Sequence, residues 1–314
     1  MKFTIAIPAY KATFLKECIN SILLQTYTDF ELIIVNDASP ENLDDIVLSF
    51  TDSRIRYYTN EKNCGAIDVV DNWNKCLSNA IGEYFILMGD DDKLMPNCLE
   101  EYLKLIEKYP MLDVYHCKSF IIDEKSDIIG FTPSWPEFES KYENIWHRIS
   151  GFRQQFISDF LYRTSALKQI GGFVKLKLAW ASDDITSFEL AKEKGIAHTQ
   201  VPTFCYRRSA ITISSSPSAN IKMEAIKQEA DWYNKLVTES TPISKLDQLY
   251  LKQIEQTLPQ YFRRKKIETI AYNGISKTNS VFDFLKWVRN RKKFSLSIKE
   301  IVYAYILFLK KVNK

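Results

Sequence analysis

The sequence has no long apolar run, no closely spaced cysteine pair and no glycine-rich dinucleotide motif, and each absence removes a class of protein. No stretch reaches the roughly 18–20 apolar residues of a membrane-spanning helix. The first ten residues lack the apolar length and the cleavage site of a signal peptide. A nicotinamide-dependent dehydrogenase is disfavoured because no Gly-x-Gly-x-x-Gly occurs.

Cysteine and histidine are too few and too scattered for a disulfide framework or a zinc site. The six cysteines form no Cys-x-x-Cys pair and do not cluster with the three histidines. We therefore expect reduced thiols and a cytoplasmic chain. We expect the isolated His116, His147 and His198 to be structural. Trp73 is expected in the core, and Trp135 and Trp146 are candidates for stacking on a sugar ring.

Charge is divided unevenly along the chain. The net charge is +3, yet the part from residue 261 onward carries 14 basic and 3 acidic residues, which gives +11 there and −8 for residues 1–260. A basic segment attached to an acidic body favours an anionic surface as partner.

The basic segment at 282–314 also contains aromatic and aliphatic residues. It predicts either a helix lying in a membrane interface, peripheral to the inner face of the cell membrane, or a helix packed on the rest of the chain, or a dimer contact. The oligomeric state stays open. Nucleic acid is disfavoured because the acidic body would repel a duplex.

Apolar patterning in the first part of the chain alternates between short strands and amphipathic helices. We expect strands at 3–7, 30–35, 55–58, 84–88 and 114–117, and helices at 13–24, 41–50, 66–80 and 97–108. This order predicts an α/β fold with a mostly parallel central sheet and helices on both faces. In such sheets the ligand lies beyond the carboxyl ends of the strands.

The second part predicts fewer strands and more helix. We expect a looser region over 123–150, helices at 164–170 and 185–194, and helix from about 220 to the end, broken near Pro242, Pro259 and Gly274. The sequence therefore predicts a domain over 1–215 and a C-terminal helical, basic region over 216–314.

Two acidic loops follow predicted strands, one with Asp37 and one with Asp90, Asp91 and Asp92. Like charges packed this closely destabilise a fold unless something neutralises them. A solvated turn with a helix N-cap is the plain alternative. Mg²⁺ or Mn²⁺ is usually held by one or two carboxylates plus substrate phosphates. The two loops together predict a divalent metal that bridges to a diphosphate.

Four segments resemble one known family. They are IPAY at 7–10, SILLQTYTDFELIIVNDAS at 21–39, Asn63-Cys64-Gly65, and GEYFILMGDDD at 82–92. In this order they are similar to the family 2 inverting glycosyltransferases, over roughly residues 3–210. The resemblance implies a GT-A fold and a metal-dependent transfer from a nucleotide-diphosphate sugar, expected to be a UDP-sugar. It also implies that the sugar is transferred to a hydroxyl of a glycan or lipid-linked acceptor in cell-surface polysaccharide biosynthesis.

The resemblance also implies roles for single residues of the donor site. Asp37 matches an acid that accepts a hydrogen bond from the base, and Asp91 matches the main metal ligand, with Asp92 as a second ligand. The residues expected to bind the nucleotide are Pro8, Ala9, Tyr10, Asp37, Asn63, Asp90, Asp91 and Arg208.

Three positions depart from the family pattern. Asn36 and Ala38 stand where the family has an acid and a glycine, and Gly89 stands where it often has an aspartate.

Lys62 is also expected near the nucleotide, and Arg207 near the diphosphate, because an arginine fork binds two phosphate oxygens.

An inverting transfer needs a base that takes the proton of the acceptor hydroxyl. The resemblance places it in the pair Asp183 and Asp184, with Asp183 as first choice. The structural alternative is an N-cap of the helix at 185–194, and both roles can hold at once.

Two other functions compete with this hypothesis. A catalytically inactive GT-A-fold nucleotide-binding module is disfavoured by the retained Asp37, Asp91 and Asp183. A nucleotidyltransferase on a related fold would need a glycine-rich phosphate loop after the first strand, which residues 8–12 lack.

Overall fold

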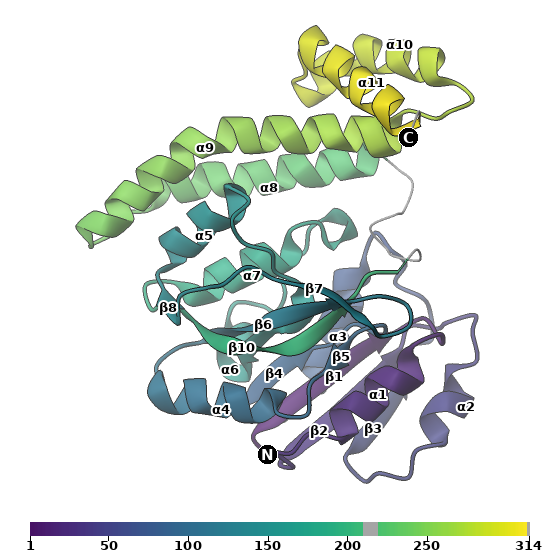
Figure 1. Ribbon diagram of the computed structural model, residues 1–314, viewed down its shortest axis with the longest axis vertical. Helices are drawn as coiled ribbons and strands as arrows, with labels where there is room; N and C mark the ends of the chain where they lie inside the picture. Colours follow the sequence, from purple (N-terminus) through teal and green to yellow (C-terminus); the bar gives the residue numbers. More distant parts are fainter. Residues whose placement is uncertain (210–218, 313–314) are drawn as a thin grey trace. The chain divides into compact units, whose positions relative to one another are not determined.

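The computed structural model describes residues 1–209 and 219–312 (Figure 1). The chain divides into two compact units, Met1–Lys175 with Ala181–Ile211, and Leu176–Trp180 with Thr212–Lys314. The predicted domain boundary at 215 lies outside the described residues. No described helix has the length and hydropathy to cross a bilayer.

The first unit alternates strands and helices as its apolar pattern predicts. Its elements are β1 (Phe3–Ala9), α1 (Leu15–Leu23), β2 (Phe30–Asn36), α2 (Leu43–Leu48), β3 (Ile55–Thr59), α3 (Val69–Ser78), β4 (Tyr84–Leu87), β5 (Lys93–Leu94), α4 (Cys98–Lys108), β6 (Val114–Ile122), β7 (Ile128–Phe131), β8 (Phe138–Glu139), α5 (Lys141–Ile149), η1 (Ile157–Asp159), β9 (Phe160–Arg163), α6 (Thr164–Gln169), α7 (Ser182–Ala191) and β10 (Ile196–Arg207).

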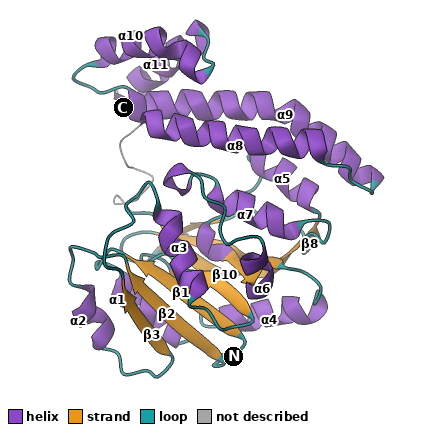
Figure 2. Ribbon diagram, turned by 180° about the vertical axis from the view of Figure 1, so that it is seen from behind, coloured by secondary structure: helices purple, strands orange, loops and turns teal. Residues whose placement is uncertain are grey.

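All ten strands of this unit form one sheet in the order β3-β2-β1-β4-β9-β6-β10-β5, with β7 on β6 and β8 on β10. Strands β3, β2, β1 and β4 are parallel, as are β6 and β10. The short strands β5, β7, β8 and β9 pair antiparallel, so the sheet is mixed beyond β4. Helices α1, α2 and α4 cover one face and α3 and α6 the other (Figures 1 and 2). The predicted α/β class is confirmed.

The hydrophobic core explains why β1, β2 and β4 read as nearly continuous apolar runs. Both faces of these strands are covered by helices, so side chains on both sides of the pleat are buried. On one face Ile5 and Ile7 of β1 join a core that includes Leu15 and Ile19 of α1. This packing fixes the register of β1 and β2 and with it the position of the loops that follow them.

The looser region predicted over 123–150 is wrong, because this segment holds β7, β8 and α5. Helix α5 begins at Ser140, whose Oγ accepts a hydrogen bond from the Glu143 N–H at 3.1 Å. This Ser-x-x-Glu spacing is a capping-box signal in the sequence.

The apolar pattern also does not predict strands β9 and β10. Polar residues and Pro202 interrupt the apolar pattern of β10, which pairs with β6 across register shifts.

The second unit is helical. Its elements are η2 (Lys177–Ala179), α8 (Ala219–Glu239), α9 (Lys245–Thr269), the π-helix η4 (Ile270–Gly274), α10 (Ser280–Asn290), η5 (Arg291–Phe294) and α11 (Ile298–Val312). The break predicted near Pro259 is wrong, since Pro259 lies inside α9. A proline removes the hydrogen bond to the carbonyl four residues earlier. Pro259 and Glu255 are both exposed, so water can satisfy that carbonyl.

Candidate donor and catalytic site

The loop after β4 is tied to the loop after β1 through Asp90. One oxygen of its carboxylate, Oδ2, accepts hydrogen bonds from the backbone N–H groups of Tyr10 and Lys11, both at 2.8 Å. Burial raises the pKa of Asp90 to about 6, although these two donors oppose the shift. Pro8 and Ala9 end β1, so the predicted nucleotide loop and the acidic triplet meet at one edge of the sheet.

Asp92 is turned into the protein. It is buried, and its two oxygens accept hydrogen bonds from the Arg207 N–H at 2.8 Å and the Ser158 hydroxyl at 3.2 Å. Burial, followed by the charge of Asp91, raises the pKa of Asp92 well above its usual range. Asp92 therefore fastens the end of β10 and the η1 turn to the acidic loop.

Asp91 is the acid of the triplet that keeps its carboxylate for another partner. In the part of the chain that the structure describes, no other side chain donates a hydrogen bond to it, and burial raises its pKa. A Cβ atom at Gly89 would lie 3.2 Å from Asp91 Oδ1 and 2.8 Å from Asp92 Oδ2. Both carboxylates thus crowd the space above Gly89, which explains why this chain has no side chain there.

Asp37 holds the loop after β2 in place. Its backbone N–H donates to the Ala9 carbonyl at 2.9 Å, and its Oδ1 accepts from Asn60 Nδ2 at 2.8 Å. The Asn63 side chain donates to the Asp37 carbonyl at 2.8 Å. Ala38 has φ 47°, the left-handed region that favours glycine, so the backbone keeps the conformation that the family's glycine would allow.

The two acids of the predicted catalytic pair lie in the first turn of α7. The helix begins at Ser182 after Ala181, so neither aspartate is its N-cap, and that alternative is wrong. Their negative charge still interacts favourably with the N-terminal end of the helix.

The two carboxylates of this pair differ in their surroundings. Asp184 is buried, and Arg148 Nε lies 3.1 Å from each of its oxygens while Gln155 Nε2 donates to Oδ1 at 2.6 Å. Asp183 is partly exposed. Burial and then the charge of Asp184 raise the pKa of Asp183 to about 7. One acid of the pair is held as an ion pair, whereas the other titrates near neutrality.

A short segment connects this pair to the acidic loop. Gln155 contacts Asp184, and Ser158, three residues later, contacts Asp92 and accepts a hydrogen bond from the Gly89 N–H at 2.9 Å. Three residues span at most about 11 Å. The catalytic pair and the acidic triplet therefore lie at the same end of the sheet. The sequence reasoning missed Arg148, Gln155 and Ser158, which belong to no recognisable motif.

The two predicted phosphate-binding arginines behave differently. Arg207 is 1% exposed, and its guanidinium donates to Glu17 Oε2, to the Asp91 carbonyl and to the Asp123 carbonyl at 2.6–2.9 Å. These contacts give Arg207 a structural role instead of the predicted one. The Arg208 backbone donates to the Ile122 carbonyl, and its side chain is exposed.

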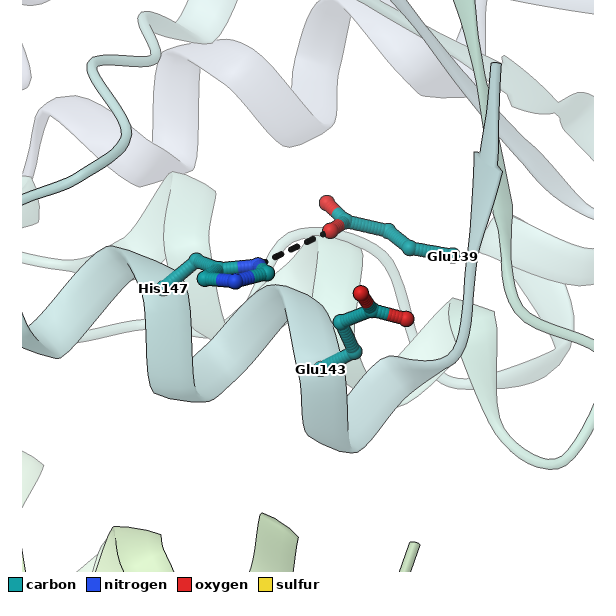
Figure 3. Close-up of side chains that lie close together, drawn as sticks. All are labelled: Glu139, Glu143 and His147. Atoms are coloured by element: carbon teal, nitrogen blue, oxygen red, sulfur yellow. Dashed lines mark hydrogen bonds and ion pairs between the residues drawn. The ribbon is translucent and has the colours of Figure 1, made fainter. Parts of the chain in front are cut away.

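A second group of side chains could hold a cation by distance alone. The ligand atoms of Glu139, Glu143 and His147 all lie within 4.8 Å of one another (Figure 3). However, Glu139 already accepts from Asn144 at 2.7 Å, contacts His147 at 3.2 Å and lies 3.8 Å from Arg153. Although burial opposes it, hydrogen bonds from the histidines hold the pKa of Glu139 below its usual range. The protein's own donors therefore stabilise this carboxylate, and the group joins β8 to α5.

The histidines are isolated in the sequence but not in the fold. His116 and His198 are fully buried, with their Nδ1 atoms 3.2 Å apart, and the Trp135 ring packs against both. Burial lowers the pKa of His198 to about 4, so this imidazole is neutral at physiological pH. Trp135 is thereby excluded from stacking on a sugar. Trp73 packs edge-on against Phe173, and its predicted core position is confirmed.

Comparison with known proteins identifies the family of this chain. The family model of glycosyl transferase family 2 matches residues 4–171. An uncharacterized glycosyltransferase of Rickettsia typhi is 35% identical over 130 residues, which are 41% of this chain and 39% of that protein. The Escherichia coli protein WfgD, named UDP-Glc:alpha-D-GlcNAc-diphosphoundecaprenol beta-1,3-glucosyltransferase, is 32% identical over 128 residues, 40% of this chain and 49% of that protein. The matches thus span less than half the length of these two curated relatives.

Solved structures show the fold. S. aureus TarS in complex with UDP-GlcNAc superposes with a TM-score of 0.60 at 16% identity, over 100% of this chain and 92% of that chain. The mannosyltransferase PcManGT from Pyrobaculum calidifontis, in complex with GDP-Man and Mn²⁺, gives 0.54 at 13% identity, over 99% and 87% of the two chains. Since the family model matches more than half of the chain, this chain belongs to glycosyl transferase family 2.

Proposed function

We propose that the protein transfers a sugar, with inversion, from a nucleotide-diphosphate donor to a hydroxyl group. The observation that carries this proposal is that Asp37 and the Asp90–Asp92 triplet follow β2 and β4 at one edge of the sheet, with the Asp183–Asp184 pair of α7 connected to the same edge. The loops of Asp37 and Asp90 are both bonded to the chain after β1, through the Ala9 carbonyl and the Tyr10 N–H. Gln155 and Ser158 connect the Asp183–Asp184 pair to the triplet. Ligands of open α/β sheets bind at this edge.

The donor is proposed to be a UDP-sugar, bound by the loops after β1 and β2. Pro8, Ala9 and Tyr10 lie at the end of β1, Asp37 follows β2, and Asn63, from the loop after β3, donates to the Asp37 carbonyl. The exposed Arg208 is the cation offered to the diphosphate. Uridine is supported by the name of the E. coli relative and by the TarS complexes with UDP-GlcNAc and UDP. The GDP-Man complex of PcManGT makes guanosine the alternative to test.

A divalent cation, Mn²⁺ or Mg²⁺, fits the acidic loop. Asp91 has a carboxylate that no other described side chain bonds, and burial raises the pKa of all three carboxyl groups of the triplet, which makes a bound cation favourable there. Asp91 is the ligand that we propose first. Asp92 is a weaker candidate than the sequence predicts, because both of its oxygens already accept hydrogen bonds. When bound, such an ion would offset the charge of the leaving diphosphate.

Asp183 is proposed as the general base. A base works best when its pKa lies near the working pH, and that of Asp183 is raised to about 7. Its carboxylate would accept the proton of the acceptor hydroxyl as that oxygen attacks the anomeric carbon. Asp184, held by Arg148 and Gln155, would keep a fixed negative charge beside it, and it remains the second candidate.

The acceptor is proposed to be a hydroxyl of a glycan or a lipid-linked saccharide in cell-surface polysaccharide biosynthesis. The printed name of the E. coli relative, with a diphosphoundecaprenol acceptor, supports this class.

Titration calorimetry with UDP, GDP and TDP, each with and without Mn²⁺, tests the donor site. We expect Mn²⁺-dependent binding of UDP that Asp91→Asn removes. The matched control is Glu143→Gln, which alters the other carboxylate group and should leave UDP binding unchanged. Absence of metal-dependent binding to any nucleotide would contradict the proposal and favour an inactive module. Release of pyrophosphate instead of a nucleoside diphosphate during turnover would indicate a nucleotidyltransferase.

A further inference from the structure

Helices α10 and α11 present apolar side chains that their own core does not use. Trp287, Ile301, Ala304 and Phe308 are buried in the core of the helical unit. Other large apolar residues of the same two helices are between 39% and 69% exposed, namely Val281, Phe282, Leu285, Ile298, Val302, Tyr303, Ile306 and Leu309. This second apolar surface needs an explanation, because large contiguous exposed apolar patches usually mark an interaction site.

The exposed residues form stripes and are not scattered. In α11, residues 298, 302, 306 and 309 follow the spacing of one helix face. Tyr305 lies on the same side of α11, and its ring packs 5.1 Å from the ring of Phe284 in α10. Phe284 is three residues after the exposed Val281 and so neighbours it on α10. The two stripes therefore meet along the contact between the helices, which lie side by side (Figures 1 and 2).

Unpaired cations border these stripes. Lys286 and Arg289 lie in α10, Lys292 in η5, and Lys299 and Lys310 in α11. None of these five residues forms an ion pair with a carboxylate of residues 1–209 or 219–312.

The two acids of these helices are already engaged. Asp283 Oδ2 accepts from the backbone and hydroxyl of Ser276, and Glu300 Oε2 accepts from the backbone and hydroxyl of Ser297. The surface thus combines exposed apolar side chains with a net positive charge.

This combination selects an anionic lipid surface. Helix α11 has 15 residues, about 22 Å at 1.5 Å per residue, and so is too short for a hydrocarbon core of about 30 Å. A second copy of the same surface would bring like charges together without acidic partners. Lipid headgroups, in contrast, pair with lysine and arginine while acyl chains receive the apolar residues. We propose that the α10–α11 surface binds the interface of a bilayer that contains anionic phospholipid, which goes beyond the proposed transfer reaction.

Co-sedimentation of the whole protein with vesicles tests this proposal. We expect binding to vesicles of phosphatidylcholine with phosphatidylglycerol, little binding to phosphatidylcholine alone, and weakening by salt. Lys299→Gln with Lys310→Gln should lower affinity for the anionic vesicles by roughly fivefold per removed cation. Leu285→Ser with Ile306→Ser should lower it by at least about tenfold.

The matched control is Leu246→Ser with Leu249→Ser in α9. These leucines are 56% and 61% exposed but lie outside the basic surface, so vesicle binding should not change. Equal binding to both vesicle types, no binding at all, or an equal loss in the control would overturn the proposal. Sedimentation velocity without lipid measures the oligomeric state. A dimer that the α10–α11 variants dissociate would show that the surface binds a second copy of the chain. UDP titration of the same samples shows separately whether the donor site is intact.

Discussion

Asp90 and Tyr10 lie 80 positions apart in the sequence, yet the Asp90 carboxylate accepts a hydrogen bond from the Tyr10 backbone N–H at 2.8 Å. The same oxygen accepts from the Lys11 N–H. This arrangement exists because β1 and β4 are parallel neighbours, so the loops that leave them meet. The contact joins the loop expected to bind the nucleotide to the loop expected to bind the metal.

We expect Asp90→Ala to weaken this junction. Two backbone donors would lose their acceptor, and because Tyr10 is exposed and Lys11 only partly buried, the cost should be about 1 kcal/mol in total, partly offset by relief of charge crowding. The free energy of unfolding in urea should fall, and UDP affinity should fall with it. Asp231→Ala, on an exposed position of α8, is the control and should change neither. Unchanged UDP affinity in Asp90→Ala would show that the junction does not shape the donor site.

Activity should depend on the ionisation of Asp183. A base acts when deprotonated, so kcat/KM should rise with pH and level off above about 7. Asp183→Asn should lower turnover by roughly 10²–10⁴ while UDP binding is retained. The measurement is the pH profile of kcat/KM for both proteins between pH 5.5 and about 9. Wild-type turnover in Asp183→Asn would transfer the role to Asp184 or exclude the pair.

The same carboxyl should make stability depend on pH. Its pKa is higher in the folded protein than in the unfolded chain, so the folded state binds the proton more tightly. Its stabilising contribution is therefore complete below about pH 4 and is lost as the pH rises through about 7. Urea unfolding at pH 5 and pH 8 should show Asp183→Asn gaining stability relative to wild type at the higher pH. An equal difference at both pH values would contradict the raised pKa.

The sequence predicts the first half of the fold well because both faces of its strands are buried. β1, β2 and β4 are short continuous apolar runs that lie between segments with the apolar spacing of a helix. Both patterns predict secondary structure strongly. β10 gives no such signal, since its sequence includes Gln200 and Pro202 and its pairing with β6 shifts register twice. Its strand conformation is decided by the neighbouring strand, which lies about eighty residues away in the chain.

The sequence likewise predicts some residues of the candidate site and misses others. Asp37, Asp91 and Asp183 could be located because each follows or begins an element that the pattern or the resemblance marks. Their partners could not, since Arg148 and Gln155 reach Asp184 only through the tertiary placement of α5 and the segment after it. Arg207 shows the opposite error. An arginine suits a phosphate, but burial and four hydrogen bonds of the guanidinium commit Arg207 to the protein.

Arg148 is expected to be needed for both stability and turnover. Arg148→Met leaves the buried Asp184 carboxylate with Gln155 as its remaining side-chain donor, which should cost about 1–3 kcal/mol, less than for a fully buried pair because Arg148 is partly exposed. The rate of transfer should also fall, because Asp184, the neighbour of the proposed base Asp183, would no longer be held in one position by Arg148. Lys104→Met, which breaks an exposed pair with Glu101, is the control and should leave stability unchanged. If Arg148→Met altered only stability, Arg148 would have no part in the reaction.

The neighbouring Arg207 and Arg208 should separate folding from donor binding. Arg207→Met removes a buried guanidinium and leaves two carbonyl groups without this donor, while Glu17 keeps Lys93 and Ser126, so it should cost about 1–3 kcal/mol of unfolding free energy. Arg208→Ala removes an exposed cation and should leave the melting temperature unchanged. If Arg208 contacts the diphosphate, its loss should weaken UDP binding by about tenfold, as expected for one charge-assisted hydrogen bond. Melting curves and UDP titrations of both variants decide the question, because wild-type UDP affinity in Arg208→Ala would exclude Arg208 from the donor site.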